Sequence, residues 1–134
     1  MRNIWIKKRG DDFESAIPIT EDKLRPIGGY FWSRDARYVL YVQDKAGDEN
    51  YHVYAVNPAE AAAGFIPKAR DLTPMDEVRA FIYRLPKSDH NKIFVGINDR
   101  DKAWQDLYTV DIDTGNRQLA VSYTHLTLPT KRIV

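Results

Sequence analysis

Short apolar segments alternate with polar turns along most of the chain. Segments 38–43 and 51–56 are rich in aromatic and β-branched residues, and Asp, Asn and Gly residues lie on either side of them. This composition favours strands over helices. Segment 29–32 and a weaker segment 69–72 complete a set of four, and the polar turn 33–37 separates the first two. The pattern therefore predicts a unit of four short strands.

The second strand of this unit is apolar on both of its faces. Val39 and Tyr41 point to one side of a strand, and Leu40 and Val42 point to the other. A strand with one face in water would alternate apolar and polar residues instead. We therefore expect this sheet to be covered on both faces.

The unit occurs again 54 residues later. Segment 33–44 matches segment 87–98, with Asp35 on Asp89, and the same offset places 52–57 on 106–111 without a gap. Tyr54 and Tyr108 become equivalent in this alignment, which favours core packing as the use of these aromatic residues. Two separate segments that agree on one spacing indicate an internal repeat.

A partial third copy lies at the start of the chain. Segment 3–7 reads like the strand around Tyr54, with Trp5 in the aromatic position, and 18–20 echoes 71–74. The chain is thus expected to begin inside one unit and to run through a complete one before it enters another.

Units of four strands at about this period, each packed between two neighbours, are typical of β-propeller blades. We therefore predict an all-β fold, a partial β-propeller of about two four-stranded antiparallel blades. Residues 1–25 would be the end of a preceding blade, 26–74 a complete blade, and 75–120 a second, nearly complete one. Residues 121–134 do not fit the pattern and resemble a translated sequencing adapter found at the ends of metagenomic reading frames, so we expect a disordered, non-native tail.

The connection between the third and fourth strands differs between the two copies. In the first copy it is the alanine-rich segment 57–64, where Pro58 near the start and Gly64 at the end predict a helical turn. In the second copy it is the tight turn 113–116. The first copy therefore carries a local elaboration.

Composition narrows the possible partners. The chain has 134 residues, a net charge of +1, 43% hydrophobic residues and no cysteine. The apolar fraction is too high for a disordered chain, and the charge offers no basic surface for nucleic acid or an anionic membrane. We expect a soluble protein without nucleic-acid or membrane partners, and composition leaves open whether its compartment is cytoplasmic or periplasmic.

Catalytic and cofactor motifs are missing from the sequence. No G-x-S-x-G motif occurs, and the serines lie in turn-like or terminal sequence at Ser15, Ser33, Ser88 and Ser122. The histidines, His52, His90 and His125, lack a second ligand at metal spacing. There is also no glycine-rich phosphate loop. We therefore predict no catalytic residue, no metal and no cofactor.

The one candidate site is an acidic loop next to the third strand, formed by Asp48, Glu49, Asn50 and His52. It could contact a peptide amino group on the substrate side, or the backbone of another blade. The alternative is a solvated hairpin loop in which Asp and Asn only set the turn geometry.

Two other features have structural and functional interpretations. Segment 111–115 looks like the start of a calcium loop, but Asn116 and Ser122 occupy positions that need Gly and Glu, so a turn is preferred. Trp104 is expected in a loop beside Lys102 and Asp106, and the sequence leaves open whether its ring is a surface for ligand stacking.

The combined strings identify a family resemblance. Segments 30–32, 38–44, 47–54 and 70–74, in this order and at blade spacing, resemble the N-terminal propeller of prolyl oligopeptidase-family serine peptidases, particularly the bacterial dipeptidyl- and acylaminoacyl-peptidase-like enzymes. The resemblance spans about residues 3–120. It implies a separate C-terminal α/β-hydrolase domain that carries the Ser, Asp and His of the triad, so no catalytic residue is transferred to this chain.

The resemblance also implies a role. The chain would be a non-catalytic propeller segment that gates the access of short peptides to the hydrolase domain, with the missing blades and that domain as its partners. The alternative is a scaffold or ligand-binding β-propeller without a hydrolase domain.

Overall fold

The computed structural model describes residues 3–23, 27, 29–44, 47–62, 64–86 and 89–121. Within these residues the chain forms short β-strands and two single-turn 3-10 helices, Phe13–Ser15 and Pro58–Glu60, and no α-helix. The strands are β1 Trp5–Ile6, β2 Ile17–Pro18, β3 Tyr30–Trp32, β4 Val39–Gln43, β5 His52–Val56, β6 Arg70–Asp71, β7 Ala80–Arg84, β8 Lys92–Asp101, β9 Trp104–Asp111 and β10 Arg117–Val121.

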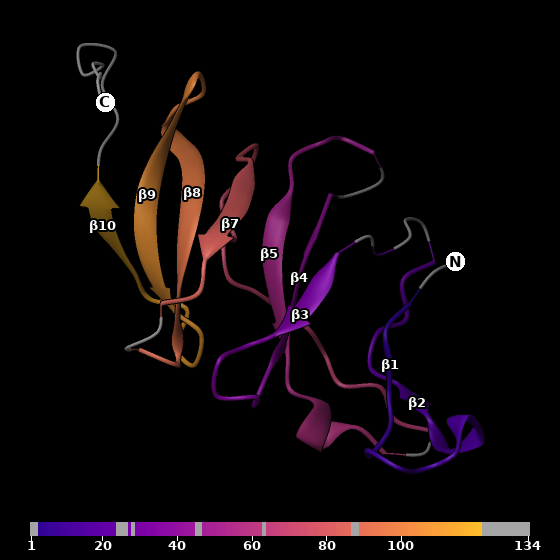
Figure 1. Ribbon diagram of the computed structural model, residues 1–134. Helices are drawn as coiled ribbons and strands as arrows, with labels where there is room; N and C mark the ends of the chain where they lie inside the picture. Colours follow the sequence, from indigo (N-terminus) through magenta and orange to yellow (C-terminus); the bar gives the residue numbers. More distant parts are fainter. Residues whose placement is uncertain are drawn as a thin grey trace.

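The strands form three antiparallel sheets. β1 pairs with β2, and the two larger sheets have the orders β3-β4-β5-β6 and β7-β8-β9-β10, so each strand lies beside its neighbour in the sequence. Figure 1 shows the three sheets in a row, with β10 at one end and β1–β2 at the other. The predicted all-β fold with four-stranded antiparallel sheets is confirmed, and the arrangement is consistent with a partial β-propeller.

The strand registers reproduce the internal repeat. Across β4 and β5, Tyr41 lies opposite Tyr54, and across β8 and β9, Val95 lies opposite Tyr108. Every pair from Val39–Val56 to Gln43–His52 has its counterpart 54 residues later. The offset found in the sequence is therefore also an offset in three-dimensional structure.

The partial copy at the start makes the same hydrogen bonds as the complete unit. The Val53 amide donates to the Thr73 hydroxyl over 3.1 Å, and the Ile4 amide donates to the Thr20 hydroxyl over 2.9 Å. A second backbone bond, from residue 72 to Val53 and from residue 19 to Ile4, also recurs. β1 and β2 thus correspond to the third and fourth strands of the larger sheets.

Apolar side chains fill the spaces between consecutive sheets. Leu40, Val53 and Ala55 of the first large sheet pack into one buried cluster with Ile93 and Val95 of the second. The opposite face of the first large sheet packs Val39, Tyr41 and Val56 against Ile4 and Ile19 of the N-terminal unit, in a separate cluster. The expectation that this sheet is covered on both faces is confirmed.

The second large sheet is covered differently on its two faces. Ile93, Val95 and Ile97 are fully buried on the face toward the first sheet. Phe94 and Leu107, on the opposite face, are only partly buried. Phe94 and Leu107 occupy the positions of Leu40 and Val53, which are fully buried in the first large sheet. Among the described residues, no segment covers Phe94 and Leu107 to the same extent.

The connections agree with the local sequence signals. Asn57 caps the 3-10 helix by accepting a hydrogen bond from the Ala59 amide over 3.0 Å. In the second unit, Gly115 has φ +78, a left-handed conformation that favours glycine, and its amide donates to the Asp111 carbonyl over 2.7 Å. The predicted helical turn and tight turn are both confirmed.

The interpretation of Trp104 as a loop residue is wrong. Trp104 begins β9 and pairs with Asp101, because β8 and β9 form a longer hairpin than the polar sequence suggests. The charged residues of this hairpin pair across the sheet: Arg100 pairs with Asp106 over 2.8 Å, and Arg117 of β10 pairs with Asp99 over 2.7 Å.

The tail expected over 121–134 is described at its first position only. Position 121 belongs to β10, and residues 122–134 lie outside the described residues.

The packing between the two large sheets predicts the cost of a cavity. Leu40 is completely buried, so Leu40→Ala should lower the free energy of unfolding by about 2–5 kcal/mol. Phe13→Ala, at a side chain that is 84% exposed, is the matched control and should change it by less than about 0.5 kcal/mol. Urea denaturation followed by tryptophan fluorescence measures both, and equal effects would contradict this account of the core.

Candidate functional site

The predicted acidic loop has a backbone shaped by its own carboxylates. The Asn50 amide donates to the Asp48 carboxylate over 3.0 Å, and the Glu49 amide donates to buried Asp44 over 3.1 Å. Glu49 has φ 59, a left-handed conformation that these bonds hold in place. The Asp48 and Glu49 residues are exposed. The structure therefore shows the turn-setting role of this loop and leaves two acidic residues at the surface.

His52 is directed toward the adjacent strand β6. Its Nδ1 lies 2.6 Å from the Asp71 carboxylate, whose other oxygen accepts the Thr73 amide over 2.9 Å. Sequence reasoning grouped His52 with Asp48 and missed Asp71. The signal that could have found it is the pairing of the third strand with the fourth, which brings residues of 52–56 next to residues of 70–71.

Two tyrosines stack beside this histidine. The rings of Tyr41 and Tyr54 lie 5.3 Å apart at an angle of 18°, and the ring of His52 lies 6.5 Å from Tyr54. Burial raises the pKa of both phenols, and the negative charges of Asp71 and Asp22 add to the effect. Both phenols consequently remain neutral near pH 7, which suits packing and hydrogen bonding rather than nucleophilic attack.

The described serines donate to groups other than histidine. The Ser33 hydroxyl donates to Asp35 over 2.6 Å, and the Ser15 hydroxyl donates to the Asp12 carbonyl over 2.6 Å. A serine nucleophile instead needs its hydroxyl beside a general base. Ser88, Ser122 and His125 lie outside the described residues, and His90 lies in the turn before β8.

In the part of the chain that the structure describes, no group of three His, Asp or Glu side chains is arranged to hold a metal ion. The same residues contain no helix long and apolar enough to cross a membrane.

A cluster of polar contacts joins the two large sheets at one rim. Asp113, in the turn between β9 and β10, accepts a hydrogen bond from the Tyr38 hydroxyl over 2.6 Å and pairs with Arg37 over 2.7 Å. Arg37 also pairs with Asp35 over 2.7 Å. Arg37 and Tyr38 hold the pKa of the Asp113 carboxyl below its ordinary value.

Arg70, on β6, completes this rim contact. Its guanidinium donates to the carbonyl of Asp113 over 2.7 Å and to the carbonyl of Ile112. The guanidinium groups of Arg37 and Arg70 lie 5.2 Å and 5.7 Å from the ring centre of Tyr38. In the sequence, Tyr38 and Arg37 are 75 and 76 positions away from Asp113, so no local sequence pattern could indicate that they meet. We call this group, Arg37, Tyr38, Arg70 and Asp113, the rim clamp.

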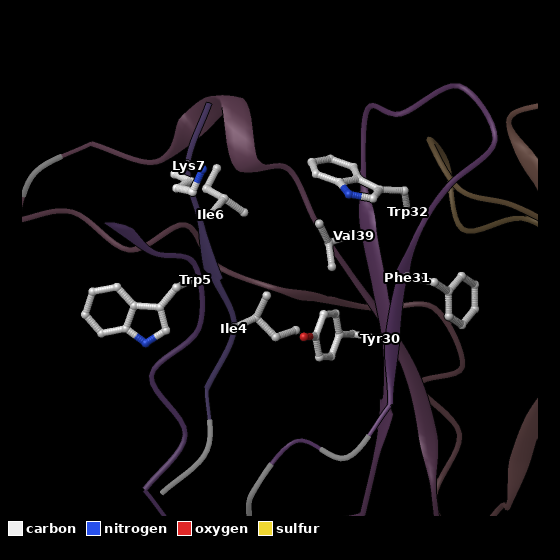
Figure 2. A pocket seen from close by; sticks show the side chains of 8 residues that line it. All are labelled: Ile4, Trp5, Ile6, Lys7, Tyr30, Phe31, Trp32 and Val39. Atoms are coloured by element: carbon white, nitrogen blue, oxygen red, sulfur yellow. The ribbon is translucent and has the colours of Figure 1, made fainter. Parts of the chain in front are cut away.

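An apolar groove of about 370 Å³ lies between β1 and the pair β3–β4. Figure 2 shows Tyr30 and Trp32 on the side of β3 that faces β1, with Phe31 on the opposite side. Trp5, Tyr30 and Trp32 are exposed by 59%, 60% and 49%. The groove therefore presents aromatic surface at the N-terminal end of the row of sheets.

Comparison with known proteins finds similarity to part of one peptidase. The chain is 38% identical over 117 residues to dipeptidyl aminopeptidase BIII of Pseudoxanthomonas mexicana, an alignment that covers 87% of this chain and 16% of that protein. No protein-family model matches the chain. The chain thus spans a small part of the length of its relative, and it is similar to a segment of a peptidase, in agreement with the peptidase resemblance found in the sequence.

The lowered pKa of Asp113 predicts a pH dependence. A carboxyl whose folded pKa lies below its unfolded value stabilises the fold above the unfolded value, about 3.9. That contribution disappears as the pH falls through the lower, folded value. Asp113→Asn should therefore be less stable than the unmodified chain at pH 7, and the difference should shrink as the pH falls through the lowered pKa of the folded Asp113 carboxyl.

Thermal unfolding between pH 2 and 7 measures this difference. Asp76→Asn, at an exposed carboxyl in the turn before β7, is the matched control and should follow the unmodified chain throughout. A constant difference between Asp113→Asn and the unmodified chain at all pH values would contradict the electrostatic account of the rim clamp.

Proposed function

We propose that this chain is a non-catalytic β-propeller segment of a longer serine peptidase. In that protein its sheets would form consecutive blades, with 26–74 as one blade and 75–120 as the next. A separate α/β-hydrolase domain would carry the catalytic triad, and the propeller would admit short peptides and exclude folded proteins. The missing blades and the hydrolase domain would be its partners within the same polypeptide.

The similarity to dipeptidyl aminopeptidase BIII is the observation that carries this proposal. The alignment extends over 117 residues, so it includes most of the repeated sheets. The fold supports it. Two four-stranded meanders with equivalent registers pack face to face, and a propeller is built in this way. Such a stack can support and screen an active site that other residues supply.

The second candidate is a scaffold or ligand-binding propeller without a hydrolase domain. The groove lined by Trp5, Tyr30 and Trp32 favours it, since exposed aromatic surface of this kind is common at binding sites. The two candidates differ in whether the longer protein releases dipeptides. We expect hydrolysis of a chromogenic dipeptidyl substrate by the longer protein, and an inactive longer protein would favour the binding propeller.

The gating role predicts a dependence on substrate length. In the longer protein, Arg70→Ala removes two hydrogen bonds from the rim clamp and should loosen one sheet against the next. We expect kcat/KM to rise several-fold for long peptides and to stay within about twofold for a dipeptidyl substrate. Arg9→Ala, in the exposed turn after β1, is the control. Equal changes for long and short substrates would argue against gating.

The acidic loop predicts a contact with the substrate amino group. In the longer protein, Asp48→Asn combined with Glu49→Gln should raise KM for a dipeptidyl substrate about tenfold or more, since a hydrogen bond to a charged group contributes about 1.5–3 kcal/mol. Inhibition by an N-acetylated dipeptide, which has no ammonium group, should not change. Glu60→Gln, at an exposed carboxyl on the 3-10 helix, is the matched control. An unchanged KM in the double variant would leave the loop with a structural role alone.

A further inference from the structure

A cavity of about 260 Å³ lies between the N-terminal unit and the first large sheet, and the function proposed above does not use it. Its walls are segment 19–22, which follows β2, Tyr41 of β4, and segment 66–69, which precedes β6. We call it the tyrosine cavity. The three parts of the wall are far apart in the sequence, so the packing of the N-terminal unit on the sheet creates the cavity.

One polar side chain in this wall is buried and has no hydrogen-bond partner. Tyr41 is only 5% exposed, and its hydroxyl makes no hydrogen bond within the described residues. The Thr20 hydroxyl in the same wall, by contrast, accepts the Ile4 amide and donates to Asn3, each over 2.9 Å. The ring of Tyr41 is held by stacking on Tyr54. Because a buried polar group without a partner costs free energy, this hydroxyl favours a ligand that bonds to it.

The electrostatic potential at this hydroxyl is negative. Glu21 and Asp22 line the cavity, and Glu21 makes no ion pair within the described residues. Burial raises the pKa of Tyr41, and the negative charges of Asp22 and Asp71 raise it further. The same negative charges that keep the phenol protonated attract a cation to its oxygen.

The positive groups near the cavity have carboxylates of their own. Lys68 lines the cavity, but it is exposed and also lines a second hollow together with Glu60 and Asp113. His52, close to the stacked tyrosines, pairs with Asp71 over 2.6 Å. In the lining itself two carboxylates face a single ammonium group, so the net charge is negative.

The rest of the wall is apolar. Ile19, Ile66, Pro67 and Ala69 complete the lining, and Ile19 and Pro67 are buried. Walls of this kind stabilise a hydrocarbon stem by removing its surface from water. A phenol oxygen and a carboxylate above apolar walls therefore fit a primary ammonium group at the end of an alkyl stem.

We propose that the tyrosine cavity binds a primary alkylammonium group, carried by a free amine or by a lysine side chain of a peptide. The ammonium group donates to the Tyr41 oxygen and to the Glu21 carboxylate, and the alkyl stem lies against Ile19 and Ile66. The acidic loop 48–50 is no part of this lining, and the site does not require the longer protein to be a peptidase.

Isothermal titration calorimetry of the longer protein with pentylammonium chloride tests the site. We expect a Kd of about 1 mM or tighter. 1-Pentanol has the same stem without the charge and should bind about tenfold more weakly, because a hydrogen bond to a charged group is the stronger one. Equal binding of the two compounds, or no binding of pentylammonium, would overturn the proposal.

N-acetyl-lysine amide separates the two sources of the ammonium group. Binding of this compound as tightly as pentylammonium would support the proposal and assign the cavity to a lysine side chain. Binding of pentylammonium alone would support it and assign the cavity to a free amine.

Two substitutions locate the bound ammonium group. Tyr41→Phe removes one oxygen and keeps the ring on Tyr54, and Glu21→Gln removes the charge of an exposed residue. Each should raise the Kd for pentylammonium about three- to tenfold. Tyr54→Phe and Glu14→Gln, neither of them in the lining, are the matched controls and should leave it unchanged. An unchanged Kd in Tyr41→Phe would overturn the site, whereas a loss of peptidase activity with binding intact would contradict only the proposed function.

Discussion

Face-to-face packing between consecutive sheets is the interaction on which the rest of this structure depends. A sheet of four short strands with apolar residues on both faces cannot bury both by itself. The first large sheet solves this by packing Leu40 and Val53 against the second sheet, and Val39 and Tyr41 against the N-terminal unit. The repeat in the sequence is the consequence, because each unit must present one face to the unit before it and one to the unit after it.

Polar contacts at the rim give this packing a fixed orientation. Apolar faces alone tolerate sliding and rotation, whereas the rim clamp requires Asp113 to meet Tyr38 and Arg37 at hydrogen-bond distance. Arg70 adds bonds to backbone carbonyls, which occupy defined positions in the turn. Exposed ion pairs contribute little to stability, so the main effect of the clamp is to fix the relative position of the sheets.

The functional interpretation follows from what the sheets do with their polar residues. His52 pairs with Asp71, the described serines donate to carboxylate or carbonyl oxygens, and the stacked tyrosines stay neutral. These groups hold strands and turns together. A segment built in this way is compatible with the non-catalytic role proposed above, and the chain is similar to part of a dipeptidyl aminopeptidase.

The sequence by itself determined the strands, the 54-residue offset and the turns. Alternation, β-branched residues and the signals at Asn57 and Gly115 act on the backbone within a few residues, so a local pattern contains them. The tertiary structure alone decided that His52 meets Asp71, that Trp104 begins β9, and that Asp113 reaches Tyr38, 75 residues away. Those contacts depend on the register between strands and on how one sheet rests on the next, and both are set by packing across the whole chain.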